Sequence, residues 1–321
     1  MAAYPLPHGI RRDLSEVEKA LEKVASQAEG GLRPPCESTL RAGGKRLRPA
    51  LVLVSGMSGS GELSALMSPA VAVELVHMAS LVHDDILDQA QTRRGRPSVY
   101  AQWGPSMATA TGDFLFSEAF EVIAGCPVAE ASQVLAETSL DLTLGELLQR
   151  RGAGTIEVGR DEYLERIRAK TASLFRASCR LGALASGAGS HEVEALSSYG
   201  ERLGMAFQIF DDVLDVSGDS ELLGKQVGAD FRDGTLTLPM MLAVEEVGDD
   251  RWLRRVFAGV PSEETVSEAI DTVRATGAIQ KAKETARCYV GAAAEAVEGL
   301  EGRRLRRVLL DIGNYVIERY D

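Results

Sequence analysis

The chain has 321 residues, of which 45% are hydrophobic and 5% aromatic, and its formal net charge at pH 7 is −12. Such an acidic excess argues against nucleic acid as the main partner, because phosphate backbones bind basic surfaces. No run approaches the roughly 18 uninterrupted apolar residues of a membrane span, so we expect no membrane-spanning helix. The length allows one large domain or two.

The cysteines and the first residues bear on the compartment. Four cysteines lie far apart without CxxC or metal-ligand spacing, which is typical of reduced residues in a cytosolic protein. The opening MAAYPLPHGIRRD contains no apolar stretch like that of a secretory signal. We therefore expect a soluble, cytoplasmic protein with an N-terminal arm over residues 1–12.

Helical periodicity runs through the rest of the chain. It predicts a first helix from Asp13, and a long helix whose N-cap is Ser68 and whose first residue is Pro69. Further helices are expected over 106–124, 131–150 and 162–184, and helical patterns continue over 239–320. No strand pattern of useful length, tandem repeat or linker is visible. The sequence predicts a single all-α domain over 1–321.

Two acidic motifs end otherwise apolar helices. In HDDILD, Asp84 and Asp88 are one helical turn apart, and the same spacing separates Asp211 and Asp215 in FDDVLD. One such motif alone is also compatible with a solvated helix end. Two copies favour paired sites for a hard divalent cation, with magnesium held between facing helix ends and its shell completed by water and substrate phosphates.

Cations accompany these motifs. GGKRLRP combines glycines with Lys45 and Arg48, which suits either a solvated loop or a diphosphate site. Three arginines follow the first acidic motif in a turn, and Lys170 falls inside an apolar helical stripe. An inward lysine requires an anionic partner, unless it extends to solvent. His77 shares a helix face with Asp84 and is either a core histidine or a substrate contact.

Gly200 and Gly204, on the helix that carries the second motif, serve either close helix packing or open space below the metals. The glycine-rich stretch 224–235 resembles a mobile lid. Metal ions would make a diphosphate a better leaving group, and an apolar interior would exclude water from the reactive carbon. The residues therefore indicate ionisation of a hydrophobic, allylic diphosphate.

The sequence resembles the trans-polyprenyl diphosphate synthases of the isoprenoid synthase fold. The resemblance extends from about Arg41 to the C-terminus and rests, in order, on GGKRLRP, ELVHMASLVHDDILD, RRGRP, TGDFLF, KTASLF, FQIFDDVLD and GKQVGAD…TLP. It implies an antiparallel helical bundle around a central cavity, usually a homodimer. The implied reaction joins isopentenyl diphosphate head to tail to an allylic diphosphate, and the released pyrophosphate accepts the proton.

The resemblance also implies roles for single residues. Three magnesium ions per site, replaceable by manganese, would be held on the allylic diphosphate by the outer aspartates of both motifs: Asp84, Asp88, Asp211 and Asp215. The middle aspartates Asp85 and Asp212 would support them. The allylic substrate would contact Arg93, Lys170, Thr171, Gln208 and Lys225, with Lys170 also counted as catalytic. Isopentenyl diphosphate would contact Lys45, Arg48, His77 and Arg94. Many relatives carry a second loop lysine where this chain has Thr235, so Thr235 is given no ligand role.

Product length depends on the residues before the first motif. In the family, large aromatics four and five positions earlier stop chain growth, whereas this chain has the small Ala79 and Ser80. The stretch most resembles medium- and long-chain, heptaprenyl-type bacterial enzymes. Some of these require a small non-catalytic subunit, and this chain would be the catalytic one. The resemblance implies that the growing chain extends into a tunnel behind these small residues, and Phe116 and Phe120 are candidates for its floor.

Other functions fit the sequence less well. A short-chain farnesyl or geranylgeranyl diphosphate synthase is the nearest alternative. A terpene cyclase would have Ser or Thr and then Glu where this chain has Asp215 and Asp219. A head-to-head synthase would not be expected to carry GGKRLRP and RRG together. A non-enzymatic acidic helical module would leave Lys170 and the paired arginines unexplained.

Overall fold

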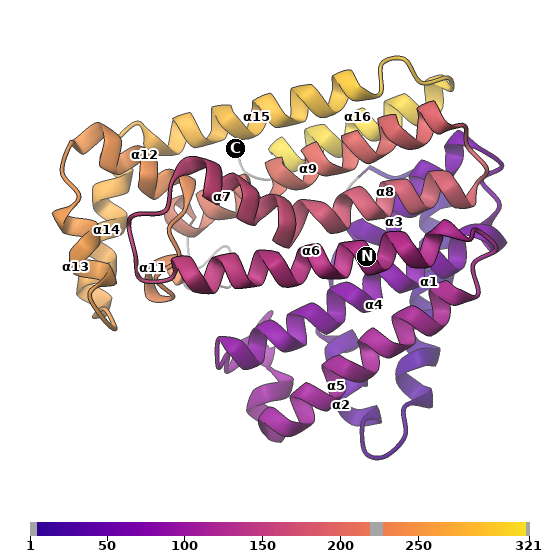
Figure 1. Cartoon of the computed structure of the whole chain (residues 1–321), viewed down its shortest axis with the longest axis horizontal. Coiled ribbons are helices and arrows are strands. Elements are labelled where there is room, and N and C mark those ends of the chain that lie inside the picture. The colour runs from indigo at the N-terminus through magenta and orange to yellow at the C-terminus, as the bar shows by residue number, and fades with distance from the viewer. Residues whose placement is uncertain (1–4, 219–226, 319–321) are drawn as a thin grey trace. The chain divides into compact units, whose positions relative to one another are not determined.

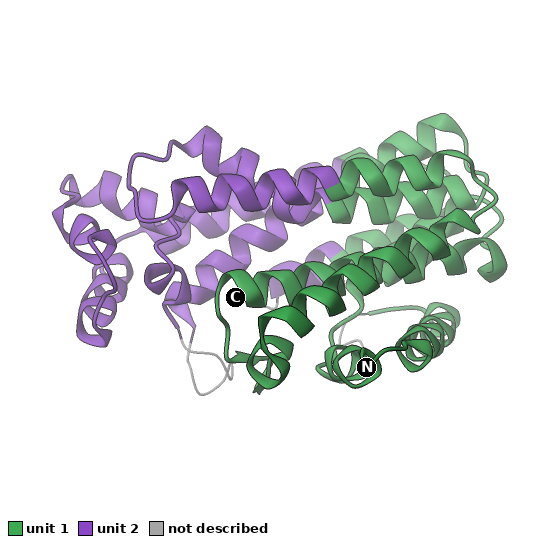
Figure 2. Ribbon diagram, turned by 60° about the horizontal axis from the view of Figure 1, so that its bottom comes forward, with its two compact units in different colours: residues 1–139, 174–200, 296–312 green, residues 140–173, 201–295, 313–321 purple. Residues whose placement is uncertain are grey.

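The computed structural model describes residues 5–218 and 227–318, and helices make up most of it (Figure 1). The prediction of an all-α fold is confirmed. Within the described ranges the strands are β1 (Thr92–Arg93) and β2 (Arg96–Pro97), which pair in a two-stranded hairpin. The chain divides into two compact units, coloured separately in Figure 2: residues 1–139, 174–200 and 296–312, and residues 140–173, 201–295 and 313–321.

Unit 1 begins with a helix that starts earlier than predicted. Helix α1 (His8–Gln27) includes residues 8–12, which were expected to belong to the arm, and it buries Val17, Leu21 and Val24. The other elements of this unit before residue 125 are α2 (Arg33–Arg41), α3 (Leu47–Ser55), η1 (Gly56–Ser58), α4 (Leu63–Leu87), the hairpin and α5 (Val99–Ala124).

Helix α4 is the central helix of unit 1. It begins at Leu63, so Ser68 and Pro69 lie inside it, and the predicted N-cap at Ser68 is wrong. Burial explains why an interior proline is tolerated, since Pro69 and most of the following residues are enclosed by the fold. By length and composition α4 alone among the described helices could cross a membrane, but 67% of its most apolar window is buried, as in a core helix.

Glycines allow the helices of unit 1 to approach closely. A Cβ on Gly182 in α8 (Ser173–Ala185) would lie 2.2 Å from the carbonyl oxygen of Val52 in α3. A Cβ on Gly200 in α9 (Ser190–Ser217) would lie 2.6 Å from the carbonyl oxygen of Phe175. Of the two roles left open for Gly200, the structure therefore supports close packing.

Unit 2 contains a helix that changes its winding. The predicted helix over 162–184 is helical throughout and consists of α7 (Arg160–Ile167), a π-helical turn η2 (Arg168–Ala172) and then α8, so the α-helical winding is interrupted by the π turn. The remaining helices of the chain are α6 (Glu130–Gly152), α11 (Ala229–Arg232), α12 (Leu238–Val247), α13 (Arg251–Phe257), α14 (Glu263–Arg274), α15 (Ala278–Ala296) and α16 (Arg303–Glu318). Helices α6, α8, α9, α15 and α16 contribute residues to both units.

Candidate active site

The first acidic motif stands at the C-terminal end of α4. Leu87 is the last helical residue and Asp88 is the C-cap, so the motif ends a helix as predicted. Asp84 is half-buried and Asp88 is exposed. Asp85 is only 3% exposed and its Oδ1 accepts a 2.8 Å hydrogen bond from Nε of Arg93. The outer two aspartates are thus the accessible ones, while the middle one anchors the hairpin.

The hairpin separates two arginines that are adjacent in sequence. Arg93 pairs with Arg96, and the connecting residues Arg94 and Gly95 have φ values of 52° and 74°. Positive φ at both positions is the type I′ turn that suits a two-residue hairpin. Arg93 contacts Asp85, whereas Arg94 extends to the glycine-rich loop, where a Cβ on Gly44 would lie 2.8 Å from its Nη1. One short turn therefore places Arg93 beside the first acidic motif and Arg94 beside the glycine-rich loop.

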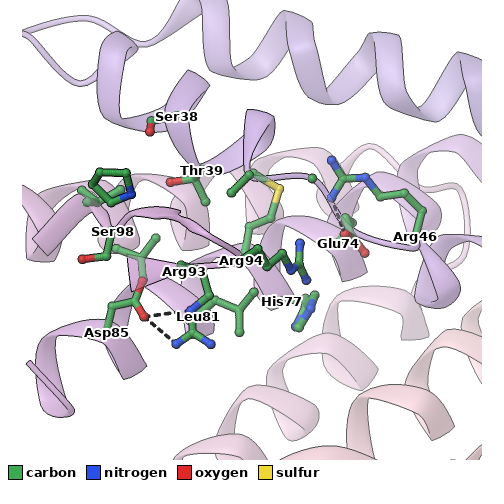
Figure 3. A pocket seen from close by; sticks show the side chains of 16 residues that line it. Ser38, Thr39, Arg46, Glu74, His77, Leu81, Asp85, Arg93, Arg94 and Ser98 are labelled. Atoms are coloured by element: carbon green, nitrogen blue, oxygen red, sulfur yellow. Dashed lines mark hydrogen bonds and ion pairs between the residues drawn. The ribbon is translucent and has the colours of Figure 1, made fainter. Parts of the chain in front are cut away.

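A pocket in unit 1 gathers these cations (Figure 3). His77 and Arg94 line it and are drawn between the Arg93–Asp85 pair and the Arg46–Glu74 pair. The Arg46–Glu74 pair is buried, with 2.7 Å between Nη1 and Oε1. The pocket thus joins the first acidic motif to the GGKRLRP segment.

Arg48 has unused hydrogen-bonding capacity beside this pocket. Its Nε is buried and has no hydrogen-bond partner among the described residues. Its guanidinium carbon lies 5.0 Å from the centroid of the Phe175 ring. Burial lowers its pKa to about 10, with the charge of Glu74 opposing and that of Arg94 adding to the shift. A bound anion would satisfy the Nε donor and restore the guanidinium's ordinary pKa.

His77 is held neutral in the same surroundings. Burial lowers its pKa well below 6.5, and the positive charges of Arg48, Arg94, Arg46 and Arg93 lower it further. These cations outnumber the nearby carboxylates, so the pocket is electrostatically prepared for an anion.

Arg46 has a different role from its neighbours in GGKRLRP. It is 8% exposed, adopts a left-handed conformation at the N-cap of α3 and, besides Glu74, donates a 2.7 Å hydrogen bond from Nε to Glu18. A fully paired arginine of this kind fixes the loop. Lys45 next to it is exposed.

His83 joins the first motif to TGDFLF on α5. A Cβ on Gly112 would lie 2.2 Å from Nε2 of His83, so only glycine leaves room for the imidazole. Phe116 stacks on the imidazole with 5.7 Å between ring centroids, and Oδ1 of Asp113 lies 3.3 Å from Nε2. Phe116 therefore lies beside the residue that precedes the first acidic motif, and its suggested place at the floor of a tunnel stays a prediction. Phe120 is 36% exposed.

The second motif has a buried middle aspartate. Asp212 is 4% exposed and accepts a 2.7 Å hydrogen bond from the hydroxyl of Tyr163 and a 2.8 Å bond from Nε2 of Gln208. Thr171 in turn donates a 2.7 Å bond to Oε1 of Gln208. Thr171 and Gln208, predicted as substrate contacts, are here connected to each other and to Asp212.

Carboxyl groups crowd around the end of α9. Asp215 accepts 3.0 Å hydrogen bonds from the amides of Ala229 and Asp230. Burial raises the pKa of Asp230 well above its ordinary value, and the negative charges of Asp215, Asp212 and Asp211 raise it further. Hard oxygen donors that repel one another fit a divalent cation such as magnesium. Among the described residues no three acidic, histidine or cysteine side chains form a complete metal site, so an ion would need further ligands.

Lys170 lies in the π turn and pairs with a residue that the sequence did not single out. Its Nζ donates a short hydrogen bond to Oε2 of Glu146 on α6. The predicted anionic partner of this inward lysine is thus supplied, at least in part, by the protein. Lys225, expected to bind the allylic substrate, lies outside the described residues.

Of the two positions tied to product length, Ala79 is fully buried and Ser80 is half-buried, with its hydroxyl donating to the carbonyl of His77. Ala79 lies one turn before His83 on the same side of α4. Since His83 contacts α5, Ala79 faces the same helix.

Comparisons with known proteins decide the family. Residues 30–273 match the model of the polyprenyl synthetase family. The chain belongs to that family. Heptaprenyl diphosphate synthase component 2 of Geobacillus stearothermophilus is 39% identical over 310 residues, 96% of each chain. A short chain isoprenyl diphosphate synthase of Methanothermobacter thermautotrophicus is 37% identical, and the match covers 97% of this chain and 98% of that protein.

A solved structure supports the same assignment. The polyprenyl synthase of Caulobacter crescentus, complexed with calcium and isoprenyl diphosphate, superposes with a TM-score of 0.92 at 32% identity, covering 97% of this chain and 96% of that chain. This polyprenyl synthetase is therefore a prenyltransferase of the isoprenoid synthase fold, and the predictions of family, fold and enzyme class are confirmed.

Proposed function

We propose that this polyprenyl synthetase joins isopentenyl diphosphate to an allylic diphosphate, head to tail, and forms a trans-polyprenyl diphosphate of medium to long chain. The observation that carries the proposal is the pocket of unit 1, which the neutral His77 and the first acidic motif both line, together with the buried Nε of Arg48, which has no hydrogen-bond partner among the described residues. Such a pocket suits one diphosphate, and Lys170 in unit 2 suits another.

Magnesium would supply the charge that lets pyrophosphate leave. The ligands would be Asp84, Asp88, Asp211 and Asp215, with three ions per site and manganese able to replace magnesium. Activity in excess chelator would contradict this assignment, as would full activity of Asp84→Asn or Asp211→Asn. If each variant loses about 3 kcal/mol of transition-state stabilisation, its turnover falls on the order of 10²-fold.

The chain's own residues bind and orient the two substrates. Arg48, Arg94, Lys45 and His77 hold isopentenyl diphosphate, and Lys170 holds the allylic diphosphate. The allylic C1–O bond breaks, pyrophosphate leaves, and the double bond of isopentenyl diphosphate forms a new bond to C1. The proton lost from the adjoining carbon goes to the released pyrophosphate, so no side chain is needed as a strong base.

The product length follows from the small residues before the first motif. The small side chains of Ala79 and Ser80 would let a growing tail pass along α4, where an aromatic side chain would block it. A heptaprenyl synthase component among the relatives supports a longer product, and a short chain synthase keeps the farnesyl or geranylgeranyl alternative in view. A terpene cyclase is disfavoured because Asp215 stands where a cyclase has Ser or Thr.

A second chain would complete the enzyme. Leu140, Leu144 and Leu147 recur at helical spacing on α6 and are 71%, 46% and 55% exposed. An apolar stripe of this kind marks a protein interface, and we propose a homodimer. Relatives named component 2 support the alternative of a small non-catalytic subunit. Light scattering of the purified chain, alone and after co-expression with such a subunit, distinguishes the two. Cytoplasmic location is part of this proposal and agrees with cysteines that are all free.

Product analysis tests the proposal directly. Labelled isopentenyl diphosphate is incubated with geranyl, farnesyl or geranylgeranyl diphosphate and magnesium, and the dephosphorylated products are separated by chromatography. We expect a ladder of labelled linear products ending at a length beyond four isoprene units. Absence of any labelled condensation product, with every starter and with both metals, would contradict the proposal.

A further inference from the structure

Gly145 and Glu146, adjacent residues on α6, both contact Lys170 in the π turn. A Cβ on Gly145 would lie 2.4 Å from the amide nitrogen of Lys170 and 2.7 Å from its Cα, so α6 touches the backbone of the turn and only glycine fits. A π turn inserted in an α-helix is frequent at functional sites. The backbone of Lys170 is thus set by the residue directly before Glu146.

Glu146 fixes the other end of the same lysine. Its Oε2 accepts the short hydrogen bond from Nζ of Lys170, and its Oε1 accepts a 2.6 Å bond from Nε of Arg150. The side chains of Glu146 and Lys170 are 17% and 25% exposed. Burial alone would raise the pKa of Glu146, but Lys170 and Arg150 outweigh it and the pKa is lowered. The carboxylate is therefore ionised and held by two cations.

A carboxylate near a site for a polyanion has an electrostatic cost, since it repels the diphosphate. It also brings a benefit, because an ammonium in an apolar stripe would otherwise be free to change rotamer. An ammonium carries three protons, so the hydrogen bond to Glu146 does not by itself prevent Lys170 from also contacting a diphosphate. Resting on the proposed function, we propose that Glu146 is a positioning residue that orients Lys170 toward the allylic diphosphate.

The test is a double-mutant cycle on kcat/KM for the allylic substrate at saturating isopentenyl diphosphate, using the wild-type chain, Glu146→Gln, Lys170→Ala and both together. Glu146→Gln should lower kcat/KM on the order of tenfold, as expected when one charge-assisted hydrogen bond is weakened. The KM for isopentenyl diphosphate should stay the same. With Lys170 already replaced by alanine, the change at Glu146 should have less than about twofold further effect.

Glu146→Asp keeps the charge on a shorter side chain and should recover part of the loss. Glu137→Gln is the matched control, since Glu137 is an exposed glutamate on α6 hydrogen-bonded to Gln133 at 2.9 Å, and it should behave as wild type. If Glu146→Gln is as active as wild type, or lowers kcat/KM equally in both backgrounds, the positioning role is refuted while the proposed function stands. If the wild-type chain forms no product, the proposed function fails, and the positioning role with it.

Discussion

The hydroxyl of Tyr163 donates a 2.7 Å hydrogen bond to Oδ2 of Asp212, joining α7 to the middle aspartate of the second acidic motif. Gln208 donates to the other oxygen of the same carboxylate. Both oxygens of a buried acid are thereby fixed from the protein side. The orientation of Asp212, and with it the end of α9, depends on a residue far away in sequence.

Tyr163→Phe should impair metal use more than stability. The ring still fills its buried position, but Asp212 loses one donor, so the magnesium concentration for half-maximal activity should rise on the order of tenfold. Magnesium titration of initial rates measures this. Tyr199→Phe is the matched control, because Tyr199 is also fully buried but donates its 2.7 Å bond to the carbonyl of Leu309. A metal requirement that moves equally in both variants would contradict the role assigned to Tyr163.

The cations should divide between the two substrates. Arg48→Ala and His77→Ala should raise the KM for isopentenyl diphosphate, because both side chains belong to the pocket region of unit 1. Lys170→Ala should raise the allylic KM or lower kcat, since its partner is the leaving group. Removing one charged contact typically costs about 1.5–3 kcal/mol, or roughly 10- to 100-fold in the affected constant. Steady-state kinetics with each substrate varied in turn measures both KM values. Equal changes in the two KM values for all three variants would contradict the division of cations between the substrates.

His77 should make stability depend on pH. Its pKa is lowered in the folded protein, so below pH 6.5 the unfolded chain binds a proton that the folded chain does not. The free energy of unfolding should therefore fall as pH decreases from 6.5, and rise again with pH. Denaturant titrations at several pH values between 5 and 7 measure the slope, which should be shallower in His77→Gln.

The same denaturant titrations can be repeated in the presence of inorganic pyrophosphate. An anion bound beside His77 would favour the imidazolium and bring its pKa back toward the ordinary value. Saturating pyrophosphate should then flatten the wild-type slope and leave that of His77→Gln unchanged. Identical slopes for the two proteins without the anion would show that His77 is not held neutral.

Ala79→Tyr should shorten the product. Ala79 is fully buried, and if the growing tail passes along α4 as we propose, a phenol ring at this position occupies space that the tail needs. We expect products of about three or four isoprene units, with the first condensation intact, because growth stops where close-packed walls leave no room. Val76→Phe, further along α4 from the motif, should stop growth later. A folded Ala79→Tyr enzyme that makes the wild-type product would mean that Ala79 only packs against α5.

Much of the fold follows from patterns that are local in sequence. Tyr163, Ile167 and Leu181 recur at helical spacing in the segment predicted as a helix over 162–184, and all are buried. The acidic motifs end their helices as expected. Local rules failed at Pro69, where a favourable helix start lies inside α4, because burial of the surrounding turns outweighs the preference of proline for the first turn.

The site shows where sequence patterns reach their limit. Arg46 is one of several cations in GGKRLRP, and only its contacts with Glu18 and Glu74 distinguish it from a substrate ligand. The sequence around Glu146 on α6 does not distinguish this residue, because its contact with Lys170 depends on how the π turn packs against α6. Pairings between distant residues depend on how helices pack, which periodicity does not specify.

The concentration of arginines around His77 in so acidic a chain has a kinetic consequence. A net charge of −12 repels an incoming diphosphate at long range, while the pocket attracts it only at short range. The Debye length is about 30 Å at 0.01 M ionic strength and about 8 Å at 0.15 M, so added salt suppresses the distant repulsion before the local attraction. Capture of isopentenyl diphosphate should therefore accelerate as ionic strength rises from very low values, opposite to the behaviour of enzymes whose overall field guides their substrates in.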